Sequence, residues 1–435
     1  MDSHKADIII IGGGAAGLMA AAGASQTFRR KGLSANVILL EKMPRPGRKI
    51  MITGKGRCNF TNAKPWNEFS EHIHPKANFL KPSFMNLNPD TLMNMLQENG
   101  MESVVERGDR AFPASHLSSD VVDALVHAAE EAGTEILCGK EVAEISVSPF
   151  CVTCTDGSTY ECKRLIICTG GLSYPKTGST GDGYRWAEQL GHDIRPLFPS
   201  LTAIVPKGYK DAGKGHIDRS VPLSESGQCL CGNQLKNVEL TVIIDGNEAQ
   251  REFGDLDFTD GGMEGPIGFK VSRKVVRAII NGSKAVAVLD LKPAVETGEL
   301  HARIGRLWDE ICKDRKYASK MYKDRFRILL GKVLPSSLAV AFHRLNQNAD
   351  HKTLASALKN WKMEINGYVG YERCVITAGG VSLDEINAKT LESKLVEGLY
   401  FAGEVLDIDA DTGGYNLHAA FSTGFLAGIS AAKVI

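Results

Sequence analysis

Short apolar runs alternate with segments of helical spacing at the start of the chain. Residues 8–11 are continuously apolar, which is typical of a strand buried on both faces of a parallel sheet. A glycine-rich turn follows, and then a helix of small residues that is expected to end at Gly32 after three basic residues. A second apolar strand at residues 35–40 ends at Glu41. This order predicts an α/β fold with a parallel sheet.

The pattern changes after residue 112. Residues 121–129 have helical spacing, with serine or aspartate before them and Gly133 after them. Short strand patterns follow at residues 134–137, 142–147, 151–154 and 158–160, and a buried strand is expected at residues 165–168. We therefore expect a small antiparallel insertion, after which the first sheet resumes.

Three segments define the expected domains. Residues 1–195 form the first part of a Rossmann-like domain, and residues 371–435 return to it with a strand at 398–404 and an Ala/Gly-rich helix at 418–430. Residues 196–370 are expected to form an inserted substrate or cap region. It combines a β subdomain, with strands at 237–244 and 285–291, and a charged helical part at about 298–342.

The first turn matches the dinucleotide-binding pattern G-x-G-x-x-G. Gly12 permits the tight turn, Gly14 lets the backbone approach a pyrophosphate, and Gly17 lets the helix pack on the strand. The helix N-terminus offers free N–H groups to the phosphates. Glu41 is placed to accept hydrogen bonds from a ribose diol. Ala15, Ala16 and Lys42 complete this group of expected contacts.

The segment at residues 46–62 favours FAD over other dinucleotides. It is too polar and glycine-rich for a core strand, and it suits a long loop laid along an extended ligand. A surface turn with solvated basic residues is the structural alternative. The expected contacts are Arg48, Lys49, Thr53, Gly54, Gly56, Arg57, Cys58 and Asn59.

Glycines and an acid recur near the C-terminus. Glu404 ends a buried strand, at the edge where open α/β sheets bind ligands, and it is expected to hold a ribityl hydroxyl. A helix N-terminus after glycines would stabilise negative charge at the flavin N1–C2=O edge. Alternatively, these glycines only end a strand and admit a tightly packed helix. The expected contacts here are Thr169, Gly170, Gly171, Gly403, Glu404, Gly414 and Tyr415.

Composition excludes several classes of function. The 435 residues carry 51 basic and 51 acidic side chains, so we expect no nucleic-acid partner. No apolar run approaches the roughly 20 residues that span a bilayer, so no membrane association is expected. Ten cysteines without a disulfide framework or zinc spacing predict free thiols, a cytoplasmic location and no metal site. Residues 313–327 hold seven basic and two acidic side chains, which indicates a solvated helical face or, alternatively, an RNA-contacting one.

These motifs together resemble the bacterial NAD(P)/FAD-dependent oxidoreductase family that includes the bile-acid-inducible 3-dehydro-bile-acid reductases. Some members carry the name aminoacetone oxidase. The resemblance covers the whole chain and rests on residues 10–17, 54–62, 258–266, 403–404 and 413–416. It implies a glutathione-reductase-like fold, extended FAD and an inserted domain over the flavin. Lys55 departs from the small residue expected there.

The resemblance also implies individual contacts. Glu41 would bind the adenosine ribose, and Arg48 with Lys49 would lie along the cofactor. Val142 would offer its backbone to adenine. The ribityl–flavin end would be held by Glu404, Asn416 and Leu417.

The chemistry expected of this chain is hydride transfer from flavin N5 to an activated C=C bond of a small apolar substrate, such as a 3-oxo steroid or bile acid. Tyr415, Tyr174 and His418 are the candidate proton donors. A second dinucleotide fingerprint is absent from the sequence, so NAD(P)H is expected to dock transiently as the electron donor. Two alternatives stay open: an amine oxidase that releases hydrogen peroxide, and a flavoprotein that acts on RNA. The sequence indicates neither the physiological substrate nor the oligomeric state.

Overall fold

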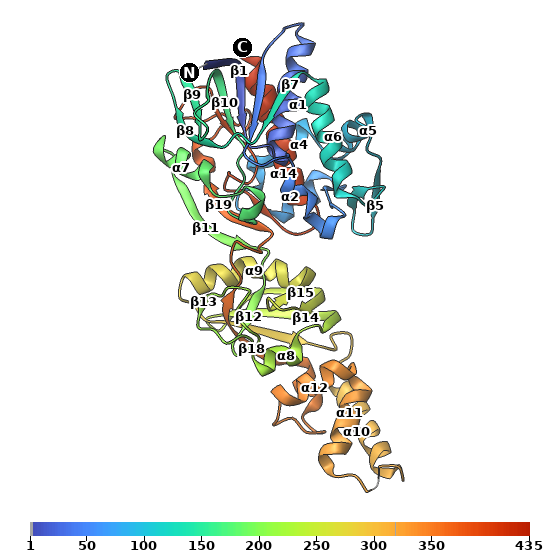
Figure 1. The fold of residues 1–435 in the computed structure, drawn as a ribbon. Coiled ribbons are helices and arrows are strands. Elements are labelled where there is room, and N and C mark those ends of the chain that lie inside the picture. Colours follow the sequence, from blue (N-terminus) through green and yellow to red (C-terminus); the bar gives the residue numbers. More distant parts are fainter. Residues whose placement is uncertain (1–2, 318) are drawn as a thin grey trace. The chain divides into compact units, whose positions relative to one another are not determined.

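The structure is a computed structural model that describes residues 3–317 and 319–435. The chain divides into two compact units. Unit 1 comprises Met1–Phe198 and Ile376–Ile435, and unit 2 comprises Pro199–Val375. Unit 1 therefore joins the two ends of the chain, drawn in blue to green and in red in Figure 1.

A seven-stranded sheet forms the centre of unit 1, in the order β7-β2-β1-β10-β9-β8, with β20 also paired to β10. Neighbouring strands are parallel from β7 to β10 and between β10 and β20, whereas β9 and β8 are antiparallel. The predicted fold class, with its antiparallel insertion, is confirmed. The strands are β1 (Ser3–Ile11), β2 (Val37–Glu41), β7 (Thr134–Cys138), β8 (Val142–Ser146), β9 (Phe150–Cys154), β10 (Thr159–Ile167) and β20 (Leu399–Phe401).

A single strand takes the place of two separate ones predicted at residues 158–160 and 165–168. Strand β10 runs through both segments because it pairs with β1 along almost its whole length. The polar residues between them, such as Lys163, lie in the middle of the strand and are wholly or partly exposed. Long-range pairing therefore overrides the local break in the hydrophobic pattern.

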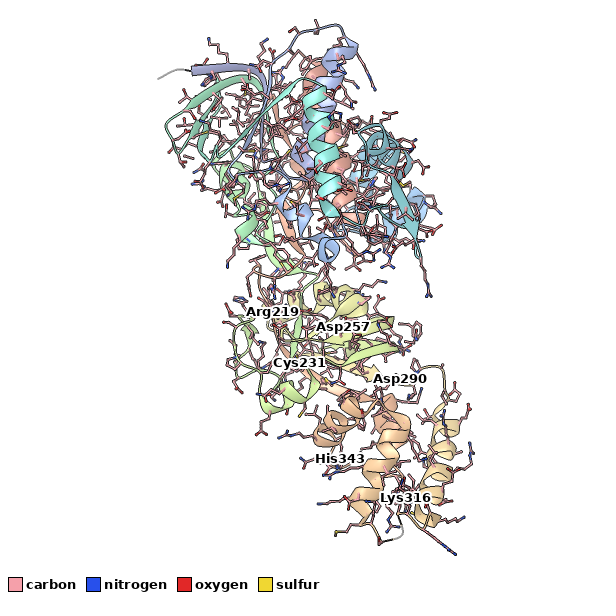
Figure 2. All side chains as sticks on the ribbon, turned by 45° about the vertical axis from the view of Figure 1, so that its right-hand side comes forward. Arg219, Cys231, Asp257, Asp290, Lys316 and His343 are labelled. Carbon is pink, nitrogen blue, oxygen red and sulfur yellow. The ribbon has the colours of Figure 1, made fainter. Side chains whose placement is uncertain are left out.

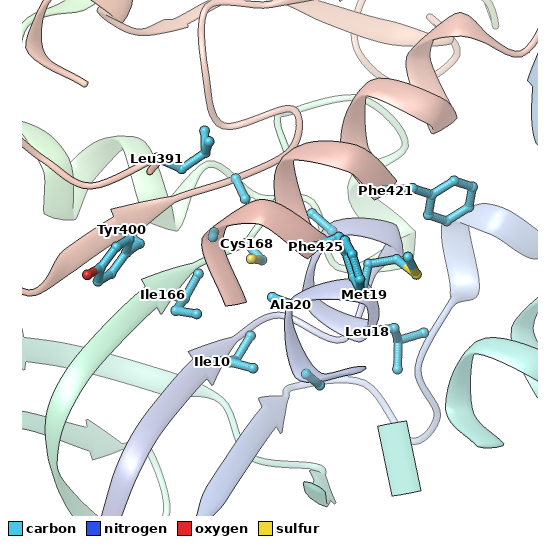
Figure 3. Packing of buried hydrophobic residues seen from close by; sticks show 14 of the residues in the cluster. Ile10, Leu18, Met19, Ala20, Ile166, Cys168, Leu391, Tyr400, Phe421 and Phe425 are labelled. Atoms are coloured by element: carbon cyan, nitrogen blue, oxygen red, sulfur yellow. The ribbon is translucent and has the colours of Figure 1, made fainter. Parts of the chain in front are cut away.

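Helix α1 (Ala15–Arg30) packs backbone to backbone against helix α14 (Tyr415–Lys433). A Cβ added to Gly424 would lie 2.1 Å from the carbonyl oxygen of Ala16, and one added to Gly428 would lie 2.0 Å from that of Ala20. Both pairs advance in the same direction, so the two helices run parallel and their N-termini open toward the same side. Figure 3 shows Phe425 of α14 beside Met19 of α1 in the buried core between them.

Smaller elements surround this core. The segment at residues 46–62, expected as a loop, contains two short helical turns, α2 (Arg48–Met51) and η1 (Thr53–Gly56). Gly47 adopts a left-handed conformation directly before α2. α6 (Ser118–Glu131) covers the other flank of α1. The remaining elements of unit 1 are α2 (Arg48–Met51), η1 (Thr53–Gly56), β3 (Thr61–Asn62), α3 (Trp66–Phe69), η2 (Ser70–His72), β4 (Ile73–His74), α4 (Ala77–Asn86), α5 (Pro89–Glu98), β5 (Ser103–Glu106), β6 (Arg110–Pro113), η3 (Pro175–Thr177), α7 (Asp182–Gln189), β11 (Ile194–Ser200), β19 (Ile376–Val381), η4 (Leu383–Glu385) and β21 (Asp409–Ala410).

Unit 2 contains a closed β barrel and a helical part. Its sheet has the order β12-β16-β15-β14-β17-β18-β13, and a further pairing of β12 with β18 closes it. The strands are β12 (Ile204–Pro206), β13 (Gly215–His216), β14 (Gln234–Ile244), β15 (Asn247–Phe258), β16 (Met263–Glu264), β17 (Ala285–Asp290) and β18 (Trp361–Tyr368). α8 (Glu225–Leu230) and α9 (Gly265–Ile280) pack on the barrel.

The helical part of unit 2 lies between β17 and β18 in the chain and is longer than the expected residues 298–342. It consists of α10 (Thr297–Lys313), α11 (Tyr322–Val333), α12 (Ser336–Leu345) and α13 (Leu354–Lys359). We call it the helical subdomain. In the described part of the chain, no helix has the length and apolar character needed to cross a membrane.

Candidate cofactor and catalytic site

The turn between β1 and α1 has the geometry of an anion site. Gly12 has φ +102°, and a Cβ on Gly17 would lie 1.8 Å from the carbonyl oxygen of Gly12, so both positions require glycine. Gly14 is the N-cap of α1, no side chain caps the helix, and nothing lies within 4 Å of a Cβ added there. The free N–H groups of the first turn therefore face open space, where an anionic group can bind.

Glu41 closes one side of this turn. Its carboxylate accepts hydrogen bonds from the backbone N–H of Gly13 at 2.6 Å and of Met43 at 2.7 Å. Burial raises the pKa of Glu41, and these two hydrogen bonds partly counter the rise. Each oxygen keeps a lone pair for a further donor. The neighbouring Lys42 instead forms an ion pair with Asp182 at 2.9 Å.

A partly buried polar cluster joins three segments of unit 1 around Glu404. Its carboxylate accepts hydrogen bonds from Lys49 Nζ at 2.6 Å, Ser173 Oγ at 2.7 Å and the backbone N–H of Thr377 at 2.8 Å. Sequence patterns pointed to Lys49 and Glu404 as cofactor contacts but not to each other. The structure shows that they bind each other, so Glu404 links the segments that carry Lys49, Ser173 and Thr377.

The loop after β10 lies beside this cluster. A Cβ on Gly171 would lie 2.5 Å from Thr377 Oγ1, and Gly170 has φ +73°. Thr169 Oγ1 is buried and has no hydrogen-bond partner among the described residues. An orphaned buried hydroxyl is costly, and a bound polar ligand would satisfy it.

The basic and polar residues of the segment at 46–62 divide into two groups. Arg57 is engaged by the protein, because it pairs with Glu106 and lies 4.5 Å from the ring of Phe112. Thr53 donates its hydroxyl to a backbone carbonyl, and Arg48 is exposed. These contacts hold the segment in place.

The other residues of this segment range from the buried Cys58 to the exposed Gly54. Burial raises the pKa of the Cys58 thiol to about 12, which keeps it protonated and unreactive. Asn59 Oδ1 is buried without a partner in the described residues, as a ligand contact would be. Gly54 and Gly56 have positive φ values of 56° and 88°. Val142 lies at the start of β8, at the edge of the main sheet.

The N-terminus of α14 has the geometry of a second anion site. Gly414 is its N-cap with φ +96°, and a Cβ there would lie 2.4 Å from the backbone of Thr61. The side chain of Asn416 is used internally, since it bonds the backbone of Ala410 at 2.8 Å and 2.7 Å. The backbone N–H groups of Tyr415, Asn416 and Leu417 have no side-chain cap and remain for a ligand.

The spacing of the two helix ends is fixed by their parallel packing. Gly424 lies opposite Ala16, and these residues are nine positions into α14 and one position into α1. At 1.5 Å per residue the two N-termini are therefore offset by about 12 Å along the helix direction. Two anion-binding ends at this offset suit one elongated ligand that carries charge at two places.

Two histidines, His72 and His74, contact the carboxylate of Asp411 close to the first turn of α14. His72 Nδ1 is 2.9 Å from Asp411 Oδ2, and His74 Nε2 is 3.6 Å from Asp411 Oδ1. Burial raises the pKa of Asp411, but the hydrogen bonds from both histidines outweigh it and hold the pKa well below its usual range. The ring of His72 stacks on Tyr415 with centroids 4.3 Å apart. We call these three residues, His72, His74 and Asp411, the histidine pair site.

The side chains of His72 and His74 are more exposed than those of His418 and Tyr415, two of the proton donors suggested by the sequence. The side chains of His72 and His74 are 25% and 35% exposed, so a substrate can reach them. His418 is wholly buried, its Nδ1 lies 2.8 Å from Thr61 Oγ1, and burial lowers its pKa to about 3. This burial makes His418 less accessible to a substrate than His72 and His74, and its role as a proton donor stays a prediction.

The two tyrosines suggested as proton donors, Tyr415 and Tyr174, differ in exposure and in backbone conformation. Burial raises the pKa of Tyr415 to about 12, so its hydroxyl is protonated, and the side chain is 3% exposed. Tyr174 is half-buried and has φ 53°, a left-handed conformation that is unusual for a bulky residue. It follows Ser173 directly and so lies next to the Glu404 cluster. Its role stays a prediction.

Comparison with known proteins places this geometry in a family. The family described as "HI0933-like protein Rossmann domain" matches residues 6–430. The chain belongs to the HI0933-like family. This match confirms the resemblance and the Rossmann-like fold predicted from the sequence. One relative is named as a reductase, which agrees with the FAD-dependent oxidoreductase predicted from the sequence.

Curated relatives match over nearly the full length of both chains. Ribosomal RNA dihydrouridine synthase of Escherichia coli K12 is 28% identical over 432 residues, which is 97% of this chain and 97% of that protein. The 3-dehydro-bile acid delta(4,6)-reductase of Clostridium scindens is 27% identical over 443 residues, 98% of each chain. Among solved structures, the open conformation of a flavocytochrome c3 fumarate reductase aligns over 99% of this chain and 78% of that chain, with a TM-score of 0.47 and 19% identity.

Proposed function

We propose that the N-termini of α1 and α14 together hold one extended FAD. The free N–H groups after Gly14 would bind the pyrophosphate, with Glu41 on the adenosine ribose. Those at residues 415–417 would bind the electron-rich edge of the flavin ring. The orphaned Thr169 Oγ1 and Asn59 Oδ1 would gain partners from the cofactor. The segment at 46–62, Val142, and the glycines at 170, 171 and 403 would line its length.

The proposed reaction is an NAD(P)H-dependent reduction of a C=C bond conjugated to a carbonyl group. When bound, FAD supplies the hydride for such a reduction. Two relatives of nearly equal identity support this reaction class. The product named for one, dihydrouridine, differs from uridine by two hydrogens across a C=C bond next to a carbonyl, and the name of the other specifies delta(4,6) bonds in a 3-dehydro acid. The two relatives are named for different substrates, whereas both names refer to reduction of a C=C bond conjugated to a carbonyl group.

The observation that carries the proposal is the position of the histidine pair site. Reduction of a conjugated C=C bond needs a proton on one carbon in addition to the hydride on the other. The carboxylate of Asp411 lies 2.9 Å from His72 Nδ1 and 3.6 Å from His74 Nε2, and the ring of His72 stacks on Tyr415 in the first turn of α14, where we place the flavin edge. We propose that one of these histidines delivers the proton, with Asp411 as its positioning residue.

The test is a two-step anaerobic reaction with the purified holoprotein. NADH or NADPH at millimolar concentration is expected to bleach the flavin absorbance. A 4-en-3-one steroid or a uridine-containing RNA is then expected to restore it while gaining two hydrogens, measured by mass spectrometry. Absence of bleaching would remove NAD(P)H as the donor. Reoxidation only by oxygen, with hydrogen peroxide formed from an amine substrate, would replace the proposal with an amine oxidase.

A further inference from the structure

A cavity lies in unit 2 where the barrel meets two helices. Strand β12 ends at Pro206, which pairs with Ile365. Residues 361–363 of β18 therefore have β17 on one side and, in the part of the chain that the structure describes, no strand on the other. Residues of α8 and the last residue of α12 complete the walls of this gap. The cavity has a volume of about 250 Å³, near the lower end of the range for ligand sites. We call it the α8–α12 cavity.

Hydrogen bonds between separate segments hold the walls of the α8–α12 cavity. Ser224, the N-cap of α8, donates its hydroxyl to the carbonyl oxygen of Gly208 at 2.5 Å. Ser337 of α12 donates to Asn233 Oδ1 at 2.8 Å, and the amide of Asn233 donates to a backbone carbonyl of α8 at 2.8 Å. Because these bonds tie both helices to the barrel, the cavity is formed before a ligand binds.

The inner surface of the cavity is apolar. Trp361, Met363 and Leu230 line it, and each is at most 9% exposed. The ring of Trp361 meets Phe342 of α12 edge-on with centroids 5.1 Å apart, which fixes its orientation. Leu345 forms part of the outer edge and is 38% exposed. A flat apolar group can bury its surface here without displacing a charged side chain.

The mouth of the cavity carries an excess of positive charge. Its charged lining residues are exposed, and two of them, Lys207 and Glu364, form an ion pair at 2.8 Å, whereas the third is Lys362. The hydrogen bond from Lys207 lowers the pKa of Glu364, and the charges of Lys284 and Lys214 lower it further. Four lysines therefore lie around the single carboxylate of the described lining. Their position beside an apolar cavity distinguishes them from lysines elsewhere on unit 2, and it suits an anionic group attached to an apolar body.

We infer that the α8–α12 cavity binds a small carboxylic acid whose apolar body is one or two flat rings. The rings would lie against Trp361 and Met363, and the carboxylate would lie between Lys207 and Lys362. Every lining residue belongs to unit 2, whereas the residues to which we assign FAD and proton delivery belong to unit 1. The acid is therefore a further ligand, and the inference does not rest on the proposed function. Since the cavity is lined by the barrel and by α12, the bound acid would stabilise the helical subdomain on the barrel.

The test titrates the purified holoprotein with 2-naphthoate, a carboxylate on two fused rings, by isothermal titration calorimetry. One molecule is expected to bind per chain, with a dissociation constant near or below about 1 mM. The uncharged 2-naphthamide has the same shape and is expected to bind at least about fivefold more weakly, because it loses the attraction of the lysines. In hydrogen–deuterium exchange, 2-naphthoate should protect residues 206–209, 226–230 and 361–364 and leave residues 12–17 and 413–418 unchanged.

A cavity-filling variant tests the shape of the site. Ser226 lines the cavity from α8 and is half-buried, so the ring of a Ser226→Phe variant would occupy the space of the ligand. This variant should lose binding of both naphthalene compounds. Gln228→Phe is the matched control, since Gln228 lies on the same helix, is exposed and is outside the lining. It should bind both compounds like the native protein.

A charge-neutralising variant tests the mouth of the site. Lys207→Gln combined with Lys362→Gln should weaken binding of 2-naphthoate at least about tenfold and leave binding of 2-naphthamide unchanged. The control combines Lys316→Gln with Lys332→Gln, two exposed lysines of the helical subdomain. Figure 2 shows Lys316 at the end of this subdomain that is remote from Cys231, the C-cap of α8. The control should bind 2-naphthoate with native affinity.

Four outcomes would overturn the inference. They are the absence of binding at several millimolar 2-naphthoate, equal affinity for 2-naphthamide, equal losses in a variant and its control, and protection by 2-naphthoate at residues 12–17 or 413–418 in place of the cavity. If Ser226→Phe does not fold, the lysine variants and the exchange experiment still decide. Failure of the proposed reduction is measured separately, since it leaves 2-naphthoate binding unchanged.

Discussion

The Gly14→Asp variant is expected to fold like the native protein and to lose its FAD. Gly14 has φ −82°, and nothing lies within 4 Å of an added Cβ, so the side chain fits without strain. It would place a carboxylate where we propose that the pyrophosphate binds. Two such charges about 4 Å apart repel by about 4 kcal/mol at an effective dielectric constant of 20, which weakens binding by roughly a thousandfold. Flavin content after purification and FAD titration of the apoprotein measure the effect.

Gly298→Asp is the matched control for this variant. Gly298 also lies in the first turn of a helix, α10, and also has nothing within 4 Å of an added Cβ. An aspartate there should leave FAD binding unchanged and slightly favour the helix. Stoichiometric FAD of native affinity in the Gly14→Asp variant would contradict the placement of the pyrophosphate at α1.

The second large effect is expected from Asp411→Asn. The amide carries no charge and has only one oxygen, so it cannot hold both imidazole rings in position as the carboxylate does, and proton delivery to the substrate should slow by about 100-fold to 1,000-fold. FAD content and bleaching by NAD(P)H should be unchanged, because those steps do not use the proton. Stopped-flow measurement of the two half-reactions separates these effects, and Asp411→Glu should recover part of the second one.

Asp384→Asn controls for the loss of an acidic ion-pair partner. Asp384 pairs with Lys76 at 2.6 Å and with Arg195 at 3.2 Å on the surface of the same unit. Its replacement should leave both half-reactions unchanged. If Asp411→Asn slows flavin reduction as strongly as substrate reduction, the histidine pair site has a general structural role and delivers no proton.

Local sequence determined which elements of unit 1 could be predicted. The apolar run of β1, the glycines at 12, 14 and 17, and the Ala/Gly-rich sequence of α14 each report a local constraint, namely double-sided burial or close backbone approach. Such constraints leave a residue pattern in the chain itself. The parallel order of the sheet followed from that pattern because strand, helix and strand are contiguous.

The histidine pair site left no comparable pattern. His72 and Asp411 are 339 positions apart and meet because β4 pairs with β21, two strands of two residues each. Strands so short have no hydrophobic period, and isolated histidines are common in sequences. The partners of Glu404 were missed for the same reason, since Ser173 and Thr377 are ordinary polar residues until the fold brings them together.

Overall composition conceals a local difference in charge. A net charge of zero argued against a nucleic-acid partner, yet it averages an acidic remainder with a basic helical subdomain. Charge acts over about one Debye length, roughly 8–10 Å, so the local balance decides what a surface attracts. The basic segment at residues 313–327 was visible in the sequence, but its exposure was not.

Hydrogen–deuterium exchange of the apoprotein with and without FAD measures most directly whether one cofactor bridges the two ends of the chain. Protection is expected to appear together in the peptides that cover residues 12–17 and 413–418, at the N-termini of α1 and α14, with no change in residues 297–359. Protection of only one of these two helix ends, at saturating FAD, would contradict the account.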